Sequence, residues 1–180
     1  PGLTGSELKH KTTGERLWFK ALRSKSEDLR LPISTSIEKM QDDLVPGDII
    51  REIKIGPFPA SDVYGGFLRA MEMRAGYHEE SWTDPSERGD RDSIYVFAYD
   101  WRLDNVENAR RLVRDVEVLK RKLKRPDLKF DIVAHSMGGI ISRYAAMYGD
   151  AELPTGDRKA VPTWAGAKLF DKVILLGTPN

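Results

Sequence analysis

The chain has 180 residues, 40% of them hydrophobic, which is enough for one domain with its own core. Its 29 basic and 28 acidic side chains leave a formal net charge of +1, which favours neither a nucleic-acid-binding protein nor an acidic interaction tail. The absence of cysteine excludes disulfides and thiolate metal sites, and the apolar runs are far shorter than the roughly 20 residues of a membrane-spanning helix.

The first part of the chain carries only short patterns. Residues 1–6 (PGLTGS) predict a glycine-rich loop and residues 17–19 a short strand. A short helix is predicted over residues 36–44, a turn at residues 46–48 (PGD), and a strand over residues 49–55.

Clearer helices and strands follow. We expect a helix over residues 63–75, capped by Ser61 or Asp62 and ended by Gly76, and then a polar surface loop over residues 78–93. Asn105 is the predicted cap of a helix whose apolar residues, at helical spacing, run as far as Leu123. The remaining predicted elements are strands at 94–97, 130–134 and 172–176, a helix at 137–148, and a loop at 150–168. Short apolar strands that alternate with helices predict a parallel sheet with helices on its faces.

The stretch IVAHSMGGII, residues 132–141, places a serine between a predicted strand and a predicted helix. Small residues two positions before and after the serine, here Ala134 and Gly138, match the G-x-S-x-G nucleophile elbow, with alanine in place of the first glycine. Ser136 is therefore the candidate catalytic nucleophile. The alternative is a serine that only caps the following helix.

Two backbone amides are candidates for an oxyanion hole. Met137 follows the serine at a helix N-terminus, where the N–H groups and the helix dipole favour a developing negative charge. Leu3, in the glycine-rich loop, is the candidate second donor.

The general base is missing from its usual place, because no histidine follows Ser136 in the sequence. We expect His10 and His78 to be exposed loop residues, and His135 to pack beneath the turn. The acids that follow, Asp150, Glu152, Asp157 and Asp171, do not come after a later strand, where a triad acid belongs. The standard triad is therefore incomplete within this sequence, which indicates either a piece of a longer enzyme or a degenerate relative.

The sequence resembles the lecithin:cholesterol acyltransferase-like group of α/β-hydrolases in the order and spacing of four motifs: residues 1–6 (PGLTGS), 99–102 (YDWR), 134–139 (AHSMGG) and 176–179 (LGTP). The resemblance covers the whole chain but only the N-terminal part of such a fold. It implies a three-layer α/β-hydrolase core with a mostly parallel sheet, truncated at both ends. Residues 1–180 would form one partial domain, with excursions at residues 10–60 and 150–168.

The same resemblance implies a serine hydrolase or O-acyltransferase that acts on lipid esters through an acyl-enzyme on Ser136. Leu3 and Met137 would form the oxyanion hole, and the acid and base would lie beyond residue 180. No metal or organic cofactor is implied. The partners are an ester substrate and, transiently, a membrane surface, which the segment at residues 17–19 would help to contact; its other interpretation is a buried core strand.

The motif at residues 99–102 follows a strand at the predicted active-site edge of the sheet. Tyr99, Asp100, Trp101 and Arg102 are expected to support the active-site loop, with Asp100 paired to Arg102 and Trp101 packed on the pair. Direct contact of these residues with substrate is the alternative.

Other functions remain open on the sequence alone. They are a peptidase, an inositol deacylase, and a non-catalytic interaction domain that keeps the serine turn as a scaffold. The lack of cysteine and of a visible signal peptide favours a microbial, cytoplasmic protein over a secreted one.

Overall fold

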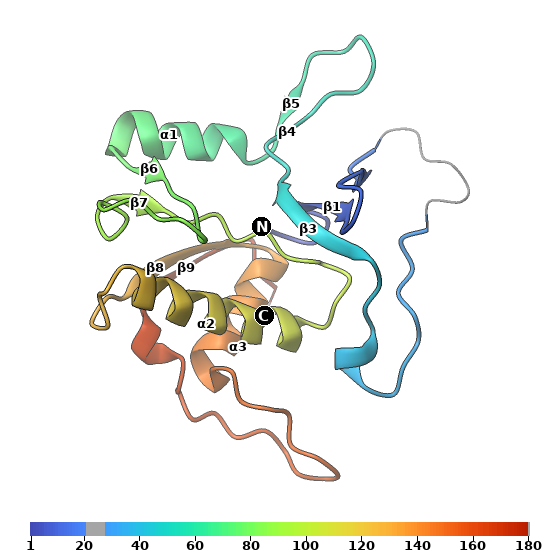
Figure 1. Cartoon of the computed structure of the whole chain (residues 1–180), viewed down its shortest axis with the longest axis vertical. Coiled ribbons are helices and arrows are strands. Elements are labelled where there is room, and N and C mark those ends of the chain that lie inside the picture. The colour runs from blue at the N-terminus through green and yellow to red at the C-terminus, as the bar shows by residue number, and fades with distance from the viewer. Residues whose placement is uncertain (21–27, 180) are drawn as a thin grey trace. The chain divides into compact units, whose positions relative to one another are not determined.

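The computed structural model describes residues 1–20 and 28–179 (Figure 1). The chain divides into two compact units, one made of Pro1–Leu3 and Asp104–Asn180, the other of Thr4–Leu103. Of the excursion predicted at residues 10–60, residues 21–27 lie outside the described part of the chain.

The unit of residues 4–103 begins with a three-stranded antiparallel sheet in the order β2-β1-β3, formed by β1 (Ser6–His10), β2 (Arg16–Trp18) and β3 (Leu44–Ile49). The turn predicted at residues 46–48 is wrong, because these residues lie inside β3, where Pro46 pairs with Leu8. A proline is tolerated there because β3 is an edge strand of this sheet, so that its missing N–H faces away from the ladder.

Two other predictions in this region fail. The helix expected over residues 36–44 is only a 3₁₀ turn, Ile37–Lys39. The strand expected over residues 49–55 is broken, since β3 ends at Ile49 and a separate antiparallel hairpin follows, formed by β4 (Glu52–Ile53) and β5 (Ser61–Asp62). Alternating isoleucines did not reveal that Ile55 belongs to the exposed connection of this hairpin.

Helix α1 (Gly65–Ala75) confirms the helix predicted before Gly76, which adopts φ 75° at the C-cap. A left-handed residue at this position suits glycine because it has no side chain to clash. The prediction of Ser61 or Asp62 as its N-cap is wrong, because the N-cap is Tyr64; the Asp62 carboxylate still accepts a 2.7 Å hydrogen bond from the amide of Gly66 within the first turn.

Two very short parallel strands follow α1 and are joined by a long loop: β6 (His78–Glu79) and β7 (Ser93–Ile94). The strand predicted over residues 94–97 therefore stops early. Beyond β7, side chains bond the backbone: Trp82 Nε1 donates to the carbonyl of Val96 at 2.8 Å, and the amide of Tyr99 donates to the Ser6 hydroxyl at 3.1 Å.

The unit of residues 1–3 and 104–180 follows the predicted pattern closely. It contains α2 (Asn105–Lys122), β8 (Phe130–His135), α3 (Met137–Tyr148), a 3₁₀ turn (Ala167–Leu169) and β9 (Phe170–Leu176). Strands β8 and β9 are parallel, and α3 packs on both strands and on α2. The cap of α2 is Asp104 rather than Asn105, since the Asp104 carboxylate accepts from the amide of Val106 at 2.8 Å.

The predicted fold class is wrong. Among the described residues there is no large, mostly parallel sheet and hence no three-layer α/β-hydrolase core; the strands form one antiparallel three-stranded sheet and three two-stranded sheets. Only the pairs β6-β7 and β8-β9 are parallel. The alternation of strands and helices was a sound local signal, but it did not determine which strands share a ladder.

In residues 1–20 and 28–179, no helix combines the length and the apolar character that crossing a bilayer requires.

The loop after β6 is held by the carboxylate of Glu80. Its oxygens accept hydrogen bonds from the Ser86 hydroxyl and, at 2.9 Å, from the Ser86 amide, and His78 Nε2 lies 3.0 Å away. The Ser86 hydrogen bonds and the nearby imidazole hold the pKa of Glu80 below its ordinary range. The charged form of this side chain therefore stabilises the loop.

Replacing Glu80 with Gln should lower the free energy of unfolding by about 1 kcal/mol at neutral pH, because charge-assisted hydrogen bonds are lost. A carboxyl with a depressed pKa contributes stability above its unfolded-state pKa and loses it as the pH falls through the folded-state value. The difference between parent and variant in urea denaturation should therefore shrink below about pH 4. Glu87→Gln, an exposed change in the same loop, is the control; an equal effect of both variants at every pH would contradict the prediction.

Candidate active site

The backbone of Ser136 joins β8 directly to α3 in a strained conformation, with φ 52° and ψ −123°. Non-glycine residues rarely occupy this region, which costs about 1–3 kcal/mol and persists only where the surroundings enforce it. Two backbone hydrogen bonds enforce it here: the Ser136 amide donates to the carbonyl of Leu176 and the Gly139 amide donates to the carbonyl of Ser136, each at 2.9 Å. A strand, a strained serine and a helix therefore follow one another as a nucleophile elbow requires.

The hydroxyl of Ser136 makes no capping hydrogen bond to α3. The alternative interpretation, a serine that serves only as a helix cap, is therefore not what the geometry provides. The residue is half-buried and stands at the N-terminal end of α3.

Small residues around the turn are required by close contacts. A Cβ on Gly138 would collide with the carbonyl oxygen of Pro1, and a Cβ on Gly139 would lie 2.6 Å from Cγ2 of Thr178. Ala134, two residues before the serine, is buried and pairs with Leu175 across the β8-β9 ladder. Gly138 is thus explained by the approach of the N-terminal loop, which sequence reasoning placed near the serine but did not connect to this glycine.

The candidate oxyanion donors are brought to the serine to different extents. Met137 is the first residue of α3, where an amide N–H has no acceptor within the helix. The N-terminal loop reaches the turn at Gly2, where a Cβ would lie only 3.0 Å from Cβ of Ser136. Leu3 is the next residue and its side chain is exposed. The loop and the elbow therefore meet within one unit, as an oxyanion hole requires.

The prediction that His135 packs beneath the turn is wrong, because the residue is exposed. Its imidazole lies between two glycines: a Cβ on Gly2 would lie 3.1 Å from His135 Nδ1, and a Cβ on Gly177 3.9 Å from Cδ2. Glycines on both sides leave space for the ring. His135 is thus a polar group at the rim of the turn, which the sequence did not reveal.

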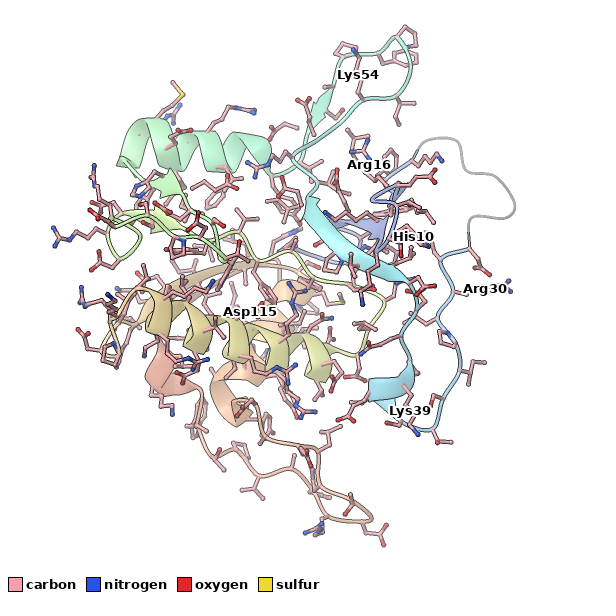
Figure 2. All side chains as sticks on the ribbon, in the orientation of Figure 1. His10, Arg16, Arg30, Lys39, Lys54 and Asp115 are labelled. Atoms are coloured by element: carbon pink, nitrogen blue, oxygen red, sulfur yellow. The ribbon has the colours of Figure 1, made fainter. Side chains whose placement is uncertain are left out.

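The other histidines are not simple loop residues. His10 ends β1, where its Nδ1 accepts weakly from the amides of Thr12 and Thr13 (Figure 2). His78 begins β6, and its Nε2 contacts both the Ser93 hydroxyl at 3.2 Å and Glu80. Because hydroxyl and carboxylate share one ring nitrogen, His78 does not have the relay geometry in which an acid holds one nitrogen and a nucleophile the other.

The acids after the serine are spread over two places. Asp150, Glu152 and Asp157 lie in the exposed segment that follows α3, and Asp171 lies at the start of β9, where it pairs with Lys172 at 2.8 Å. This pairing lowers the pKa of Asp171. The Lys172 ammonium, not an imidazole, is therefore the ionic partner of Asp171.

The motif at residues 99–102 lies in the other unit and has a clear internal structure. Tyr99 and Asp100 are buried, and the Trp101 indole donates to the carbonyl of Ser6 at 3.1 Å. The predicted pair is present, with Arg102 Nη2 2.7 Å from the Asp100 carboxylate. Burial raises the pKa of the Tyr99 phenol, which keeps it neutral. The role of these residues in supporting an active-site loop stays a prediction.

The guanidinium of Arg102 also binds Asp42, at 2.7 and 2.8 Å, through a bidentate contact that the sequence did not reveal. Burial opposes the charge of Arg102, but the hydrogen bonds to Asp100 and Asp42 together raise its pKa above the ordinary value. Asp42 lies sixty residues away in the chain, so no spacing pattern signals the contact. Arg102 thus fastens the segment before β3 to the motif at residues 99–102.

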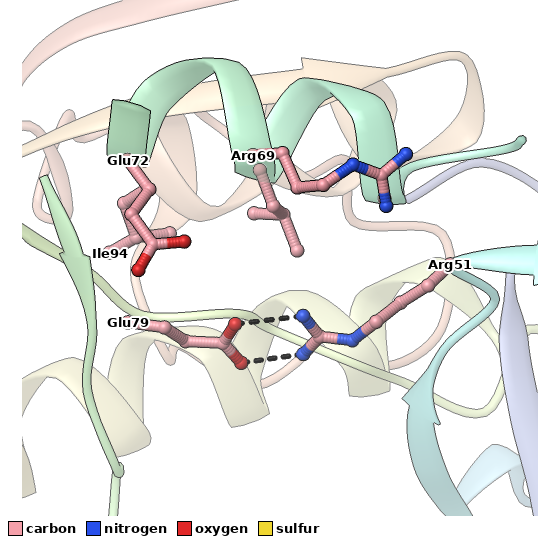
Figure 3. A pocket seen from close by; sticks show the side chains of 7 residues that line it. Arg51, Arg69, Glu72, Glu79 and Ile94 are labelled. Carbon is pink, nitrogen blue, oxygen red and sulfur yellow. Dashed lines mark hydrogen bonds and ion pairs between the residues drawn. The ribbon is translucent and has the colours of Figure 1, made fainter. Parts of the chain in front are cut away.

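The cavity that the structure shows is lined by residues of the other unit and not by the serine turn. A small cavity of about 100 Å³ lies in the other unit between α1 and β6 (Figure 3). Both arginines that line it are paired, Arg51 with Glu79 and Asp48, and Arg69 with Asp62. These charges hold the unit together, and the cavity presents no uncommitted guanidinium to a ligand.

Among the described residues, no cluster of three or more histidine, aspartate and glutamate side chains has the arrangement of a metal site. Comparisons of the chain with models of protein families, with curated proteins and with solved structures give no match.

Gly138→Ala should destabilise the unit by about 1–3 kcal/mol, because the new methyl group must displace the Pro1 carbonyl. Thermal or urea unfolding measures the loss. Ala134→Gly is the matched control, since it changes one methyl group on the other side of the serine and restores the glycine of the elbow pattern. Equal stabilities of Gly138→Ala and the parent would show that the loop does not press on this turn.

Arg102→Lys should lower the free energy of unfolding by about 2 kcal/mol or more, since an ammonium group cannot reproduce the forked contacts to Asp42 and Asp100. The control is Arg111→Lys in the exposed pair with Asp115 on α2, where the expected change is below about 0.5 kcal/mol. Chemical denaturation of both variants tests the difference. Similar losses of unfolding free energy at the two sites would mean that the forked contacts of Arg102 add no more stability than an exposed ion pair.

Proposed function

We propose that the protein transfers acyl groups from lipid esters through Ser136, as a serine hydrolase or O-acyltransferase of the lecithin:cholesterol acyltransferase-like kind. The observation that carries the proposal is the strained backbone of Ser136, whose hydroxyl is not used to cap α3. Strain at a polar residue between a strand and a helix is typical of functional sites. The proposal rests on this local turn and not on a large parallel sheet.

In the proposed reaction, Ser136 Oγ attacks the ester carbonyl carbon while a histidine takes the hydroxyl proton. The carbonyl oxygen becomes an oxyanion, which accepts hydrogen bonds from the amides of Met137 and Leu3. The intermediate collapses, the alcohol leaves with the proton from the histidine, and an acyl-enzyme remains. Water or an acceptor alcohol then repeats the sequence in reverse and frees Ser136.

The proposal requires a histidine base and an acid and assigns neither to a residue, since no histidine follows Ser136 in the sequence. The motif at residues 99–102 would support the active-site loop, and no metal or organic cofactor takes part. A lipid ester is favoured over a peptide by the four motifs of the resemblance. A microbial, cytoplasmic setting completes the proposal, on the basis of the cysteine-free composition.

The test is fluorophosphonate labelling of the native source protein, followed by mass spectrometry of the labelled peptide. We expect one modified residue, Ser136, and loss of both labelling and ester turnover in Ser136→Ala. Ser81→Ala, an exposed serine of the other unit, should leave labelling unchanged. Labelling that persists in Ser136→Ala would refute the assignment. A native protein that is folded but never labelled would identify the serine turn as a non-catalytic scaffold.

A further inference from the structure

The connection between β4 and β5, residues 54–60 (KIGPFPA), is an exposed apolar tip. Ile55 is 53% exposed and Phe58 68% exposed, and neither side chain belongs to the core of its unit. Figure 1 shows the hairpin projecting away from the N-terminal end of α1. We call residues 54–60 the hairpin tip.

A tight turn joins the two residues that carry the apolar side chains. The amide of Phe58 donates to the carbonyl of Ile55 at 3.3 Å, and Gly56 between them adopts φ 56°. Positive φ at the first central residue suits glycine, and Pro57 holds the second central residue. Ile55 and Phe58 are therefore the first and last residues of one turn, whose backbone hydrogen bond lowers the backbone entropy that binding would cost.

Three of the seven residues of the hairpin tip offer no free backbone N–H group. Pro57 and Pro59 have no N–H group, and the N–H of Phe58 is already bonded to Ile55. An unpaired N–H costs several kcal/mol in an apolar medium, so removing donors lowers the cost of placing this backbone among lipid chains. A loop that stays in water does not need fewer free N–H groups, because water bonds them.

Size and charge favour a lipid surface over a protein partner. A stable protein interface buries about 800 Å² on each side, far more than an isoleucine and a phenylalanine on a projecting ribbon provide. Insertion of a tip into the interface of a bilayer requires only about 5–10 Å of depth. Lys54 is the single charged residue between positions 54 and 60, and its place on the hairpin suits anionic headgroups (Figure 2).

We propose that the hairpin tip is a lipid-surface anchor, in which Ile55 and Phe58 enter the headgroup and acyl boundary while Lys54 binds anionic headgroups. This role differs from the contact expected at residues 17–19. There, the Trp18 indole donates to the carbonyl of Thr4 at 2.9 Å and its ring packs on Trp101, so Trp18 is half-buried and held against its own unit. The anchor does not depend on the chemistry of Ser136, although it would place an enzyme of lipid esters at its substrate.

The test is flotation of the full chain with vesicles of phosphatidylcholine, with and without phosphatidylglycerol. Phe58→Glu and Ile55→Glu should each weaken vesicle binding roughly tenfold, the effect of keeping one large apolar side chain out of the bilayer. Phe58→Trp should bind as the parent does. Lys54→Gln should weaken binding several-fold on the anionic vesicles alone.

The matched control is Val161→Glu, which introduces the same charge at an exposed apolar residue beside a proline in the other unit. It should bind vesicles as the parent does, and circular dichroism should show all variants folded. The proposal is overturned if the parent does not float with vesicles, or if Val161→Glu loses as much vesicle binding as Phe58→Glu. It is also overturned if Phe58→Glu abolishes self-association of the protein without lipid, which would identify a second copy as the occupant. Fluorophosphonate labelling of Phe58→Glu without vesicles should equal that of the parent, so failure of the anchor and failure of the proposed chemistry give different results.

Discussion

The conformation of Ser136 is the constraint on which the unit of residues 1–3 and 104–180 depends. A left-handed serine between β8 and α3 is held only because the carbonyl of Leu176 accepts its amide and the amide of Gly139 closes the next turn. The same turn brings the Pro1 carbonyl against Gly138, so the N-terminal loop, β9 and α3 all converge on one residue. Strain at this point is offset by the packing of α3 on β8, β9 and α2.

In the unit of residues 4–103, buried polar contacts connect distant segments where ladders are short. The Ser6 hydroxyl accepts from the Tyr99 amide, and the Ser6 carbonyl accepts from the Trp101 indole. Arg102 binds the carboxylates of Asp42 and Asp100. Each contact satisfies a group whose burial without a partner would cost several kcal/mol. Among the backbone groups involved, the Tyr99 amide and the Ser6 carbonyl bond side chains.

A serine elbow and a lipid-binding tip make a consistent pair of proposals. Lipid esters are concentrated at surfaces, and an enzyme that binds such a surface weakly and reversibly meets a high local concentration of substrate. The proposed anchor has two exposed apolar side chains, Ile55 and Phe58, which suits binding of that kind. The two devices lie in different units and are testable separately.

The sequence by itself determined the local elements with strong periodicity: α2, α3, β8 and β9 match their predicted ranges, because apolar spacing and a serine flanked by small residues are local signals. It also predicted the pairing of Asp100 with Arg102, which the structure confirms, whereas the catalytic roles of Ser136 and Met137 stay predictions. Only the tertiary structure decided how strands are grouped, that Asp42 completes the Arg102 cluster, and that His135 is exposed while Trp18 is not. These depend on contacts between residues far apart in the chain, and hydrogen-bond partners at such separations leave no periodic trace in a single sequence.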